Sequence, residues 1–310
     1  MNLIGNRLYI PLIDAVLERG EDLALGTGIT IHVLTDNFRE TIGGNEAIAG
    51  QYSRSIEHMQ VALALDPATL LPGEHRSLHD AQLVGIFVAM LIRLTTGIPV
   101  DIPFWIDAQD DEICGYGNTQ VRMFRTGNRY QYPLDAGDQA DSLGLLGNAL
   151  NELVALNLNE GNKNRVIRAS RFAFVGFQIF HVPTRLVNHV TFLEALFSTA
   201  TIELAHQLSS RIAWYLAPTD PNQREELFYS VKDIYKARSQ VVHGSDYSKK
   251  EAEIRAQLES VEILSQRVFT YILAREHIAL FSVRSDHRVR ELQKLGLGID
   301  SEFSALAAAD

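Results

Sequence analysis

The chain has 310 residues, of which 46% are hydrophobic, and it carries 28 basic against 38 acidic side chains, a net charge of −10. This hydrophobic content supports packed cores and excludes a largely disordered chain, and the length corresponds to about two domains of ordinary size. The acidic balance excludes a protein that coats DNA or anionic membranes with a uniformly basic surface, but it leaves room for a local basic site.

The charge is unevenly distributed along the chain. Residues 1–159 hold nine arginines and no lysine against 20 acidic residues, whereas residues 160–295 hold 19 basic against 15 acidic residues. The last segment, from Gly296, holds three acidic residues and no basic one. This change in composition predicts a first domain of residues 1–137, a second domain of residues 138–295 and an acidic C-terminal tail of residues 296–310.

The first part has the pattern of a mixed α/β domain. Residues 28–35 are rich in β-branched side chains and predict a strand, and residues 78–94 are long and apolar enough for a buried helix. Residues 98–106 contain two prolines, so we expect an edge strand at most. Residues 119–125 predict a further strand, and the glycines and asparagine of residues 115–118 predict a turn.

Several compositional features bear on location and cofactors. The single cysteine, Cys114, allows no intramolecular disulfide and no cysteine-based metal site. The N-terminus lacks the pattern of a signal peptide, and the longest apolar run, residues 83–92, is shorter than the roughly 20 residues of a membrane span. His75 and His79 have a spacing that can bind zinc, but no third ligand is evident. We therefore expect a cytoplasmic protein without a membrane segment, a metal or another cofactor.

The second part is helical in pattern throughout. Residues 143–158 and 166–180 repeat apolar side chains at helical spacing, and a single long helix is predicted from Thr184 to just before Pro218. Four or five helices joined by short loops predict an antiparallel bundle.

The boundaries of the last two helices are marked by capping signals. Asp220 followed by Pro221 predicts a helix start, and Gly244 predicts the end of the same helix. Ser248, with Glu251 three residues later, predicts the start of the next one.

Arg238 lies on the apolar stripe of the helix that begins at Pro221. A guanidinium on a core-facing stripe stays charged, so it requires a carboxylate or phosphate partner. If its role is structural, Glu194 or Glu203 on the preceding helix would pair with it, or the side chain would extend to the rim of the core.

His243 follows five residues after Arg238 and directly precedes Gly244. Five residues of regular helix turn a side chain about 140° away, so the two could converge only where the helix ends. The partial negative charge of a helix C-terminus favours a protonated imidazole, which suits acid–base chemistry. The alternative is a histidine that caps the last carbonyl groups.

The sequence around these two residues resembles a known family. Residues 234–244 (IYKARSQVVHG) strongly resemble the core motif of ApeA-like HEPN domains. Residues 192–197 (FLEALF) and 210–216 (SRIAWYL) look like the preceding helix of that family, in the expected order. The resemblance covers about residues 140–285, and residues 1–135 resemble no family that we identify.

The resemblance implies an N-terminal α/β domain followed by an all-α HEPN helical bundle. Many HEPN members with an intact Arg-x4–6-His motif are metal-independent endoribonucleases, commonly dimeric, and many act as effectors or toxins in antiviral defence. Arg238 and His243 match the two motif residues. Many members carry Asn, Asp or His directly after the arginine, where this chain has Ser239, which leaves the role of that position open.

The residue types fit RNA cleavage by the adjacent 2′-hydroxyl. This reaction requires a base for the hydroxyl proton, an acid for the leaving 5′-oxygen and a cation for the charged phosphorane. Arginine suits the last role because its fork matches phosphate oxygens. One histidine cannot hold and lack a proton at the same moment, so we expect a homodimer that presents two copies of His243.

The expected partners are RNA, a second copy of the chain and a regulatory or defence-complex protein. Lysines flank the motif and could line the path of an RNA backbone, or simply be solvated helix faces: Lys232, Lys236, Lys249 and Lys250. The main alternative is a non-catalytic HEPN dimerisation or nucleotide-binding subunit of a larger complex, in which Arg238 forms a structural ion pair. A further alternative is a nucleic-acid mimic built from the acidic first domain.

Overall fold

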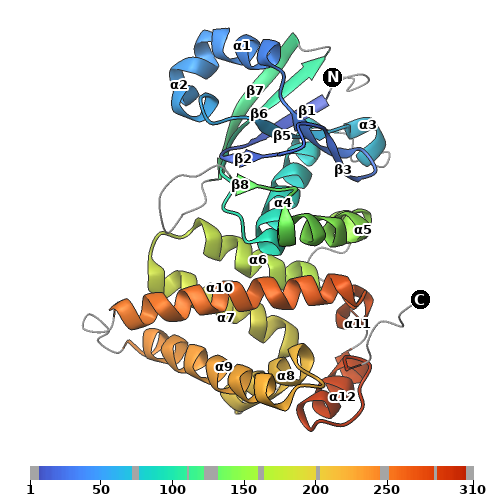
Figure 1. Ribbon diagram of the computed structural model, residues 1–310, viewed down its shortest axis with the longest axis vertical. Coiled ribbons are helices and arrows are strands. Elements are labelled where there is room, and N and C mark those ends of the chain that lie inside the picture. The colour runs from blue at the N-terminus through green and yellow to red at the C-terminus, as the bar shows by residue number, and fades with distance from the viewer. Residues whose placement is uncertain are drawn as a thin grey trace. The chain divides into compact units, whose positions relative to one another are not determined.

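The computed structural model describes residues 7–71, 77–109, 112–121, 132–159, 164–199, 203–244, 251–282 and 285–304. The chain forms two compact units, Met1–Val154 and Ala155–Asp310. The first contains a β-sheet and the second is helical, so the layout of an α/β part followed by an all-α part is confirmed (Figure 1).

The division of the chain into two units falls within α5 (Gly137–Asn159), later in the sequence than residue 137, where the composition changes. The reason is that α5 packs on the first unit. The Asn151 side chain of α5 accepts a hydrogen bond of 3.0 Å from the backbone N–H of Thr27, beside the sheet. This hydrogen bond attaches α5 to the segment after β3, so most of α5 is part of the first unit.

The first unit is built on a six-stranded antiparallel sheet. Its strands, in spatial order, are β3 (Leu23–Gly26), β4 (Ile29–Val33), β5 (Val61–Leu65), β1 (Arg7–Leu12), β6 (Ile102–Gln109) and β7 (Glu112–Val121). A short parallel pair joins β2 (Ala15–Val16) to β8 (Tyr132–Pro133). Its helices, besides α5, are α1 (Asp36–Gly44), α2 (Glu46–Ile56), α3 (Pro67–Leu70) and α4 (Leu78–Thr96).

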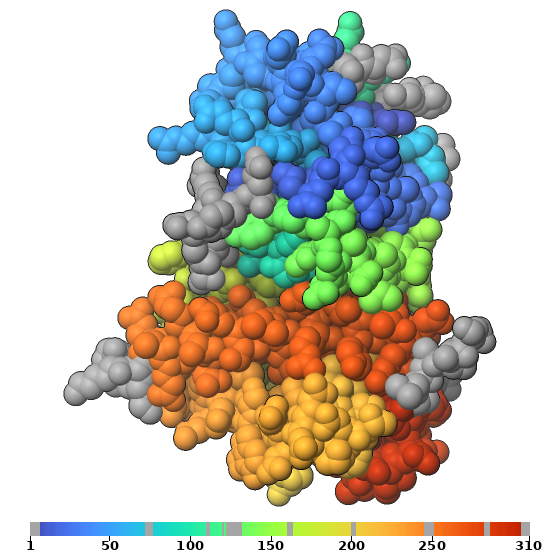
Figure 2. All heavy atoms as spheres, in the orientation of Figure 1, coloured from blue at the N-terminus to red at the C-terminus, as the bar shows by residue number. Residues whose placement is uncertain are grey.

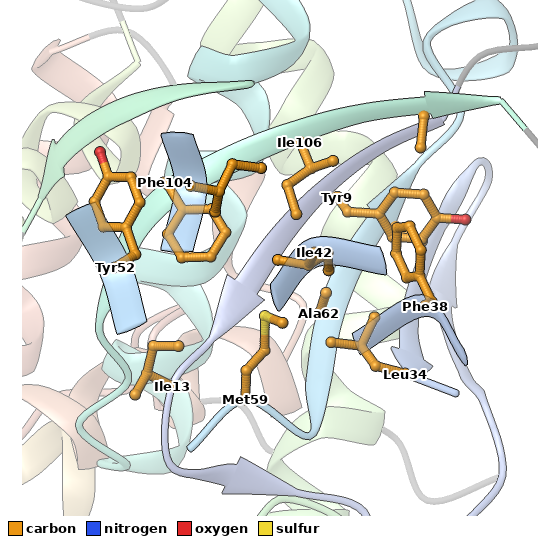
Figure 3. Close-up of a cluster of buried hydrophobic side chains, with 13 residues drawn as sticks. Tyr9, Ile13, Leu34, Phe38, Ile42, Tyr52, Met59, Ala62, Phe104 and Ile106 are labelled. Atoms are coloured by element: carbon orange, nitrogen blue, oxygen red, sulfur yellow. The ribbon is translucent and has the colours of Figure 1, made fainter. Parts of the chain in front are cut away.

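Alternate residues of the strands face opposite layers of helices. On one face, Tyr9 of β1 and Ile106 of β6 pack with Phe38 and Ile42 of α1, and the cluster is completed by α2 (Figure 3). On the other face, Ile10 lies against α4 at Gly85, where a side chain would collide with it. Both faces of this sheet are therefore covered by apolar contacts.

The edge position expected for a strand at residues 98–106 is wrong. β6 begins at Ile102 and lies between β1 and β7, inside the sheet. Pro103 is tolerated there because β1 pairs only with residues 106–108 of β6, and the pairing with β7 is irregular between Ile102 and Phe104. The missing N–H of Pro103 thus falls where no ladder bond is required.

The turn expected at residues 115–118 is also wrong, because this segment lies within β7. Gly117 pairs with Trp105 of β6, and a Cβ atom at Gly117 would lie 2.7 Å from the indole ring. The glycine therefore makes room for a cross-strand tryptophan. The strand expected at residues 119–125 overlaps β7 as far as Val121, and residues 122–125 lie outside the described ranges.

The apolar helix expected at residues 78–94 is confirmed as α4, which Ser77 caps through a hydrogen bond from the Asp80 N–H. Within the described part of the chain, it is the one helix whose length and composition would suit a membrane span. Most of that stretch is buried inside the structure, as in a core helix.

The second unit is a helical assembly centred on α7. After the end of α5, its helices are α6 (Arg165–Gln178), α7 (Val182–Phe197), α8 (Leu204–Leu216), α9 (Pro221–Val242), α10 (Glu251–Ala274), α11 (Ile278–Ser282) and α12 (Ser285–Gly296). Helix α7 contacts α6, α8, α9 and α10, and α9 and α10 run side by side (Figure 1).

The single helix expected from Thr184 to Pro218 is in fact two helices, α7 and α8. Helix α7 ends at Phe197, Ser198 is extended, and Glu203 has a left-handed φ of 55° before α8 begins. The apolar spacing continues across the break, so periodicity alone could not detect it. The last carbonyl groups of α7 accept hydrogen bonds from arginines of other helices instead of from a following helical turn.

The capping signals of α9 are confirmed. The Asp220 carboxylate accepts hydrogen bonds from the N–H groups of Asn222 and Gln223, and Gly244 ends the helix with a left-handed φ of 69°. The described part of helix α10 starts at Glu251, and its expected cap, Ser248, lies outside the described residues. The segment expected as a tail is partly core, since Phe303 is fully buried against Phe281.

Candidate functional site

The candidate residues lie on the C-terminal half of α9. The helix buries Leu227, Val231, Ile234 and Ala237, and this stripe places Arg238 at the edge of the core, with 21% of its side chain exposed. Its position beside Ala237 therefore leaves the guanidinium partly inside the bundle, close to α7.

Arg238 pairs with Glu194 of α7. The distance between Arg238 Nη2 and Glu194 Oε1 is 3.4 Å, and the glutamate side chain is 16% exposed. Among the described residues, neither Arg238 Nε nor Glu194 Oε1 has a hydrogen-bond partner. The contact is thus an ion pair without a well-formed hydrogen bond, and it leaves donor capacity on the guanidinium.

Burial governs the electrostatics of this pair. Desolvation raises the pKa of Glu194, and the charge of Arg238 offsets this effect only in part. Burial also raises the pKa of Tyr235, the Glu194 carboxylate raises it further, and Arg238 acts in the opposite direction. The Arg238 guanidinium lies 5.6 Å from the centroid of the Tyr235 ring. These three side chains form one coupled group.

A pocket of about 550 Å³ lies beside this group. Tyr235 belongs to both, because its ring contacts Arg238 and also lines the pocket. The pocket brings together the histidine, the serine and two of the lysines expected from sequence. Its lining residues are Ala205, Lys232, Asp233, Tyr235, Lys236, Ser239, Gln240 and His243.

His243 lies at the C-cap of α9 and is exposed. Its backbone N–H donates to the Ser239 carbonyl at 3.0 Å, which continues the helical pattern to the last residue before Gly244. The neighbouring Val242 is 50% exposed. The imidazole is therefore at the surface, next to an unburied apolar side chain.

The structure separates some residues that the sequence grouped together. Arg238 does not line the pocket that contains His243, because its guanidinium turns toward Glu194. Of the two expected carboxylate partners, Glu194 is confirmed. Glu203 is not, since it is an exposed residue at the start of α8 and the carboxylate paired with Arg238 is that of Glu194.

The expected lysines divide between described and undescribed residues. Lys232 and Lys236 are exposed and line the pocket. Lys249 and Lys250 lie outside the described residues. On the face shown in Figure 2, the side chains of α9 and of the darker orange α10 occupy adjoining areas of the second unit.

Tyr235 is a site residue that we did not predict from the sequence. It precedes Arg238 by three residues, and side chains three apart on a helix are neighbours. An aromatic residue at this spacing was therefore a usable signal for a ring beside the guanidinium.

A second polar pocket, of about 480 Å³, lies in the first unit. His32 Nδ1 lies 2.7 Å from Asp22 Oδ2, and both residues line the pocket with Arg7 and Asp66. Burial acts to raise the pKa of Asp22, but hydrogen bonds from His32 and the Val33 N–H outweigh it and lower the pKa. This dyad fixes the orientation of one imidazole, a relation between distant residues that the sequence did not indicate.

Within the described ranges, no group of three or more histidine, cysteine, aspartate or glutamate side chains could hold a metal ion. His79 lies in α4, whereas His75 is outside those ranges.

Comparisons with family models, with curated proteins and with solved structures found no match to this chain.

Proposed function

We propose that the second unit is a metal-independent endoribonuclease of HEPN type. In this proposal Arg238 binds the scissile phosphate, and two copies of His243 take the proton of the 2′-hydroxyl and give a proton to the leaving 5′-oxygen. The observation that carries it is the pocket at the end of α9, which holds His243, Ser239 and two lysines within a few turns of Arg238.

The proposed reaction forms a bond between the 2′-oxygen and phosphorus and breaks the bond to the 5′-oxygen. One imidazole takes the 2′-hydroxyl proton and an imidazolium gives a proton to the 5′-oxygen, which leaves a 2′,3′-cyclic phosphate. Arg238 neutralises the phosphorane charge. Lys232 and Lys236, both exposed, would contact the flanking phosphates.

The weak pairing of Arg238 supports a role beyond structure. Its contact with Glu194 lacks a hydrogen bond, and a phosphate group can offer the guanidinium two. We infer that phosphate competes with Glu194 for Arg238, with Tyr235 forming the shared wall between the ion pair and the pocket.

The exposed position of His243 supports a composite site. A homodimer in which two copies of the α9 C-terminus approach each other would place two imidazoles at one phosphate, one as base and one as acid. Val242, half exposed beside His243, provides apolar surface for such a contact. The same proposal includes a cytoplasmic location and a role as an effector or toxin in antiviral defence.

The test is incubation of labelled RNA with the purified protein, residues 1–310, in EDTA. His243→Ala and Arg238→Ala should each lose cleavage, and the wild-type products should end in 2′,3′-cyclic phosphate. His206→Ala is the matched control, since His206 is exposed on the neighbouring α8 and does not line the pocket. Equal cleavage by all four proteins would reveal a contaminant and overturn the proposal.

The Arg238–Glu194 ion pair favours a second candidate, a non-catalytic HEPN dimerisation module. A double-mutant cycle with Arg238→Gln and Glu194→Gln distinguishes the two. If the arginine is structural, the pair should contribute a coupling free energy of about 1 kcal/mol or more to stability. If it serves phosphate, the coupling should be near zero, and Glu194→Gln should cleave RNA at least as fast as the wild type.

A further inference from the structure

Four arginines of the second unit gather at the C-terminal end of α7, and what we infer from them does not depend on the proposed nuclease. Arg165 and Arg168 come from α6, Arg211 from α8 and Arg288 from α12. We call these four residues the arginine cluster. Arg288 interacts electrostatically with each of the other three, so it lies at the centre of the group.

Three members of the arginine cluster cap consecutive carbonyl groups of α7. Each donates through one Nη1 group to a carbonyl that has no helical partner, because α7 ends there. The bonds join Arg165 to Ala195 O at 2.7 Å, Arg288 to Leu196 O at 3.3 Å and Arg211 to Phe197 O at 2.5 Å.

The arginine cluster has an excess of positive charge in a buried place. Arg288 is 2% exposed and Arg211 is 5% exposed. In the part of the chain that the structure describes, no carboxylate lies within ion-pair distance of any of the four guanidinium groups. The end of a helix offers only about half a negative charge, which cannot balance four cations.

The burial and the crowding of like charges lower the pKa values of two of these arginines. Burial lowers the pKa of Arg211 to about 10. Burial also lowers the pKa of Arg288 to about 10, and the like charges of the other three arginines add to the effect. Buried charges in proteins are as a rule paired, so an arrangement of this kind requires a compensating anion.

Unused donors in the arginine cluster show where an anion would bind. Among the described residues, Arg288 donates through Nη1 alone, and the Arg168 side chain makes no hydrogen bond. Arg165 and Arg168 are only partly buried and form the open side of the cluster. An oxyanion placed among these groups could accept several charge-assisted hydrogen bonds.

We propose that the arginine cluster is a binding site for a phosphate group, either inorganic phosphate or the phosphate monoester of a small ligand. Phosphate fits better than a halide, because it carries up to two charges and offers oxygen atoms that match the guanidinium fork. Gly296 of α12 packs on the Arg211 side chain, where a Cβ atom would lie 3.3 Å from Arg211 Cγ, which fixes the cluster from the side of α12.

The experiment is thermal unfolding and calorimetric titration of the protein, residues 1–310, purified without phosphate. Inorganic phosphate is compared with sodium chloride at equal ionic strength. At a phosphate concentration of about 100 times Kd, the melting temperature should rise by about 5 °C, and chloride should produce no comparable rise. An equal response to both salts, or no response to phosphate, overturns the proposal.

Variants separate ligand binding from helix capping. Arg168→Gln removes a partly exposed charge that caps no carbonyl, so the protein should keep its melting temperature and lose at least tenfold in phosphate affinity. Arg288→Met should lose the phosphate response while losing little basal stability, because it also relieves repulsion. Arg255→Gln, on the exposed face of α10, is the matched control and should respond like the wild type. A full phosphate response in Arg168→Gln and Arg288→Met would refute the site.

Discussion

His277 provides a sharp prediction about acid stability. It follows α10, is 8% exposed and lies among the aromatic rings of Tyr215 and Phe303. The Tyr215 hydroxyl lies 3.2 Å from His277 Nδ1, and burial raises the pKa of Tyr215, so the hydroxyl keeps its proton and donates a hydrogen bond to the imidazole. This arrangement favours the neutral imidazole.

Burial lowers the pKa of His277 from 6.5 to about 4, with a further contribution from the charge of Arg275. The unfolded chain therefore takes up a proton near pH 6.5, whereas the folded chain does so only near pH 4. Stability from this residue is fully present above pH 6.5 and is lost as the pH falls toward 4. A difference of 2.5 pKa units corresponds to about 3 kcal/mol of unfolding free energy.

The measurement is urea unfolding of the wild type and of His277→Asn between pH 7 and pH 4. Asparagine keeps an acceptor for the Tyr215 hydroxyl but cannot titrate, so the variant should lose about 3 kcal/mol less stability than the wild type over this range. His206→Asn, at an exposed position, should retain the wild-type dependence. Parallel pH profiles for the wild type and His277→Asn would refute the assignment of a buried neutral histidine.

Three further substitutions test the packing, each followed by chemical unfolding. Gly117→Ala places a Cβ atom against the Trp105 ring and should cost about 1–3 kcal/mol; a neutral result would mean that the ring can move aside. Gly144→Ala, on an exposed face of α5 with open space around it, should instead gain about 0.4–1 kcal/mol, and a loss there would contradict the helical assignment. Glu262→Gln removes the charge that compensates the buried Arg185, whose Nε lies 2.5 Å from Glu262 Oε1, and should cost about 3–5 kcal/mol at pH 7. Burial acts to raise the pKa of Glu262, but hydrogen bonds and charges from His189 and Arg185 lower it overall, so wild-type stability from this group should fall below pH 4.5, a loss that the glutamine variant should not show.

Local signals in the sequence determined most of the helices. Asp220 and Pro221 mark the start of α9 and Gly244 its end, because each acts on backbone groups within one helical turn. The long apolar segment of α4 likewise predicts a buried helix, and residues 87–96 of α4 are buried without interruption. The requirement of Arg238 for a carboxylate partner followed from charge and burial, and Glu194 supplies it.

The tertiary structure decided what depends on distant residues. Phe197 ends α7 because arginines of α6, α8 and α12 occupy its last carbonyl groups, although the apolar spacing continues into α8. Pro103 lies inside the sheet because β1 does not pair with it there, and Gly117 remains extended because Trp105 lies across from it. Arg238 turns toward Glu194 and away from the pocket that holds His243. Capping and periodicity act within a few residues and can be read from the sequence, whereas hydrogen-bond competition, strand order and the direction of a long side chain are set by partners that only folding brings near.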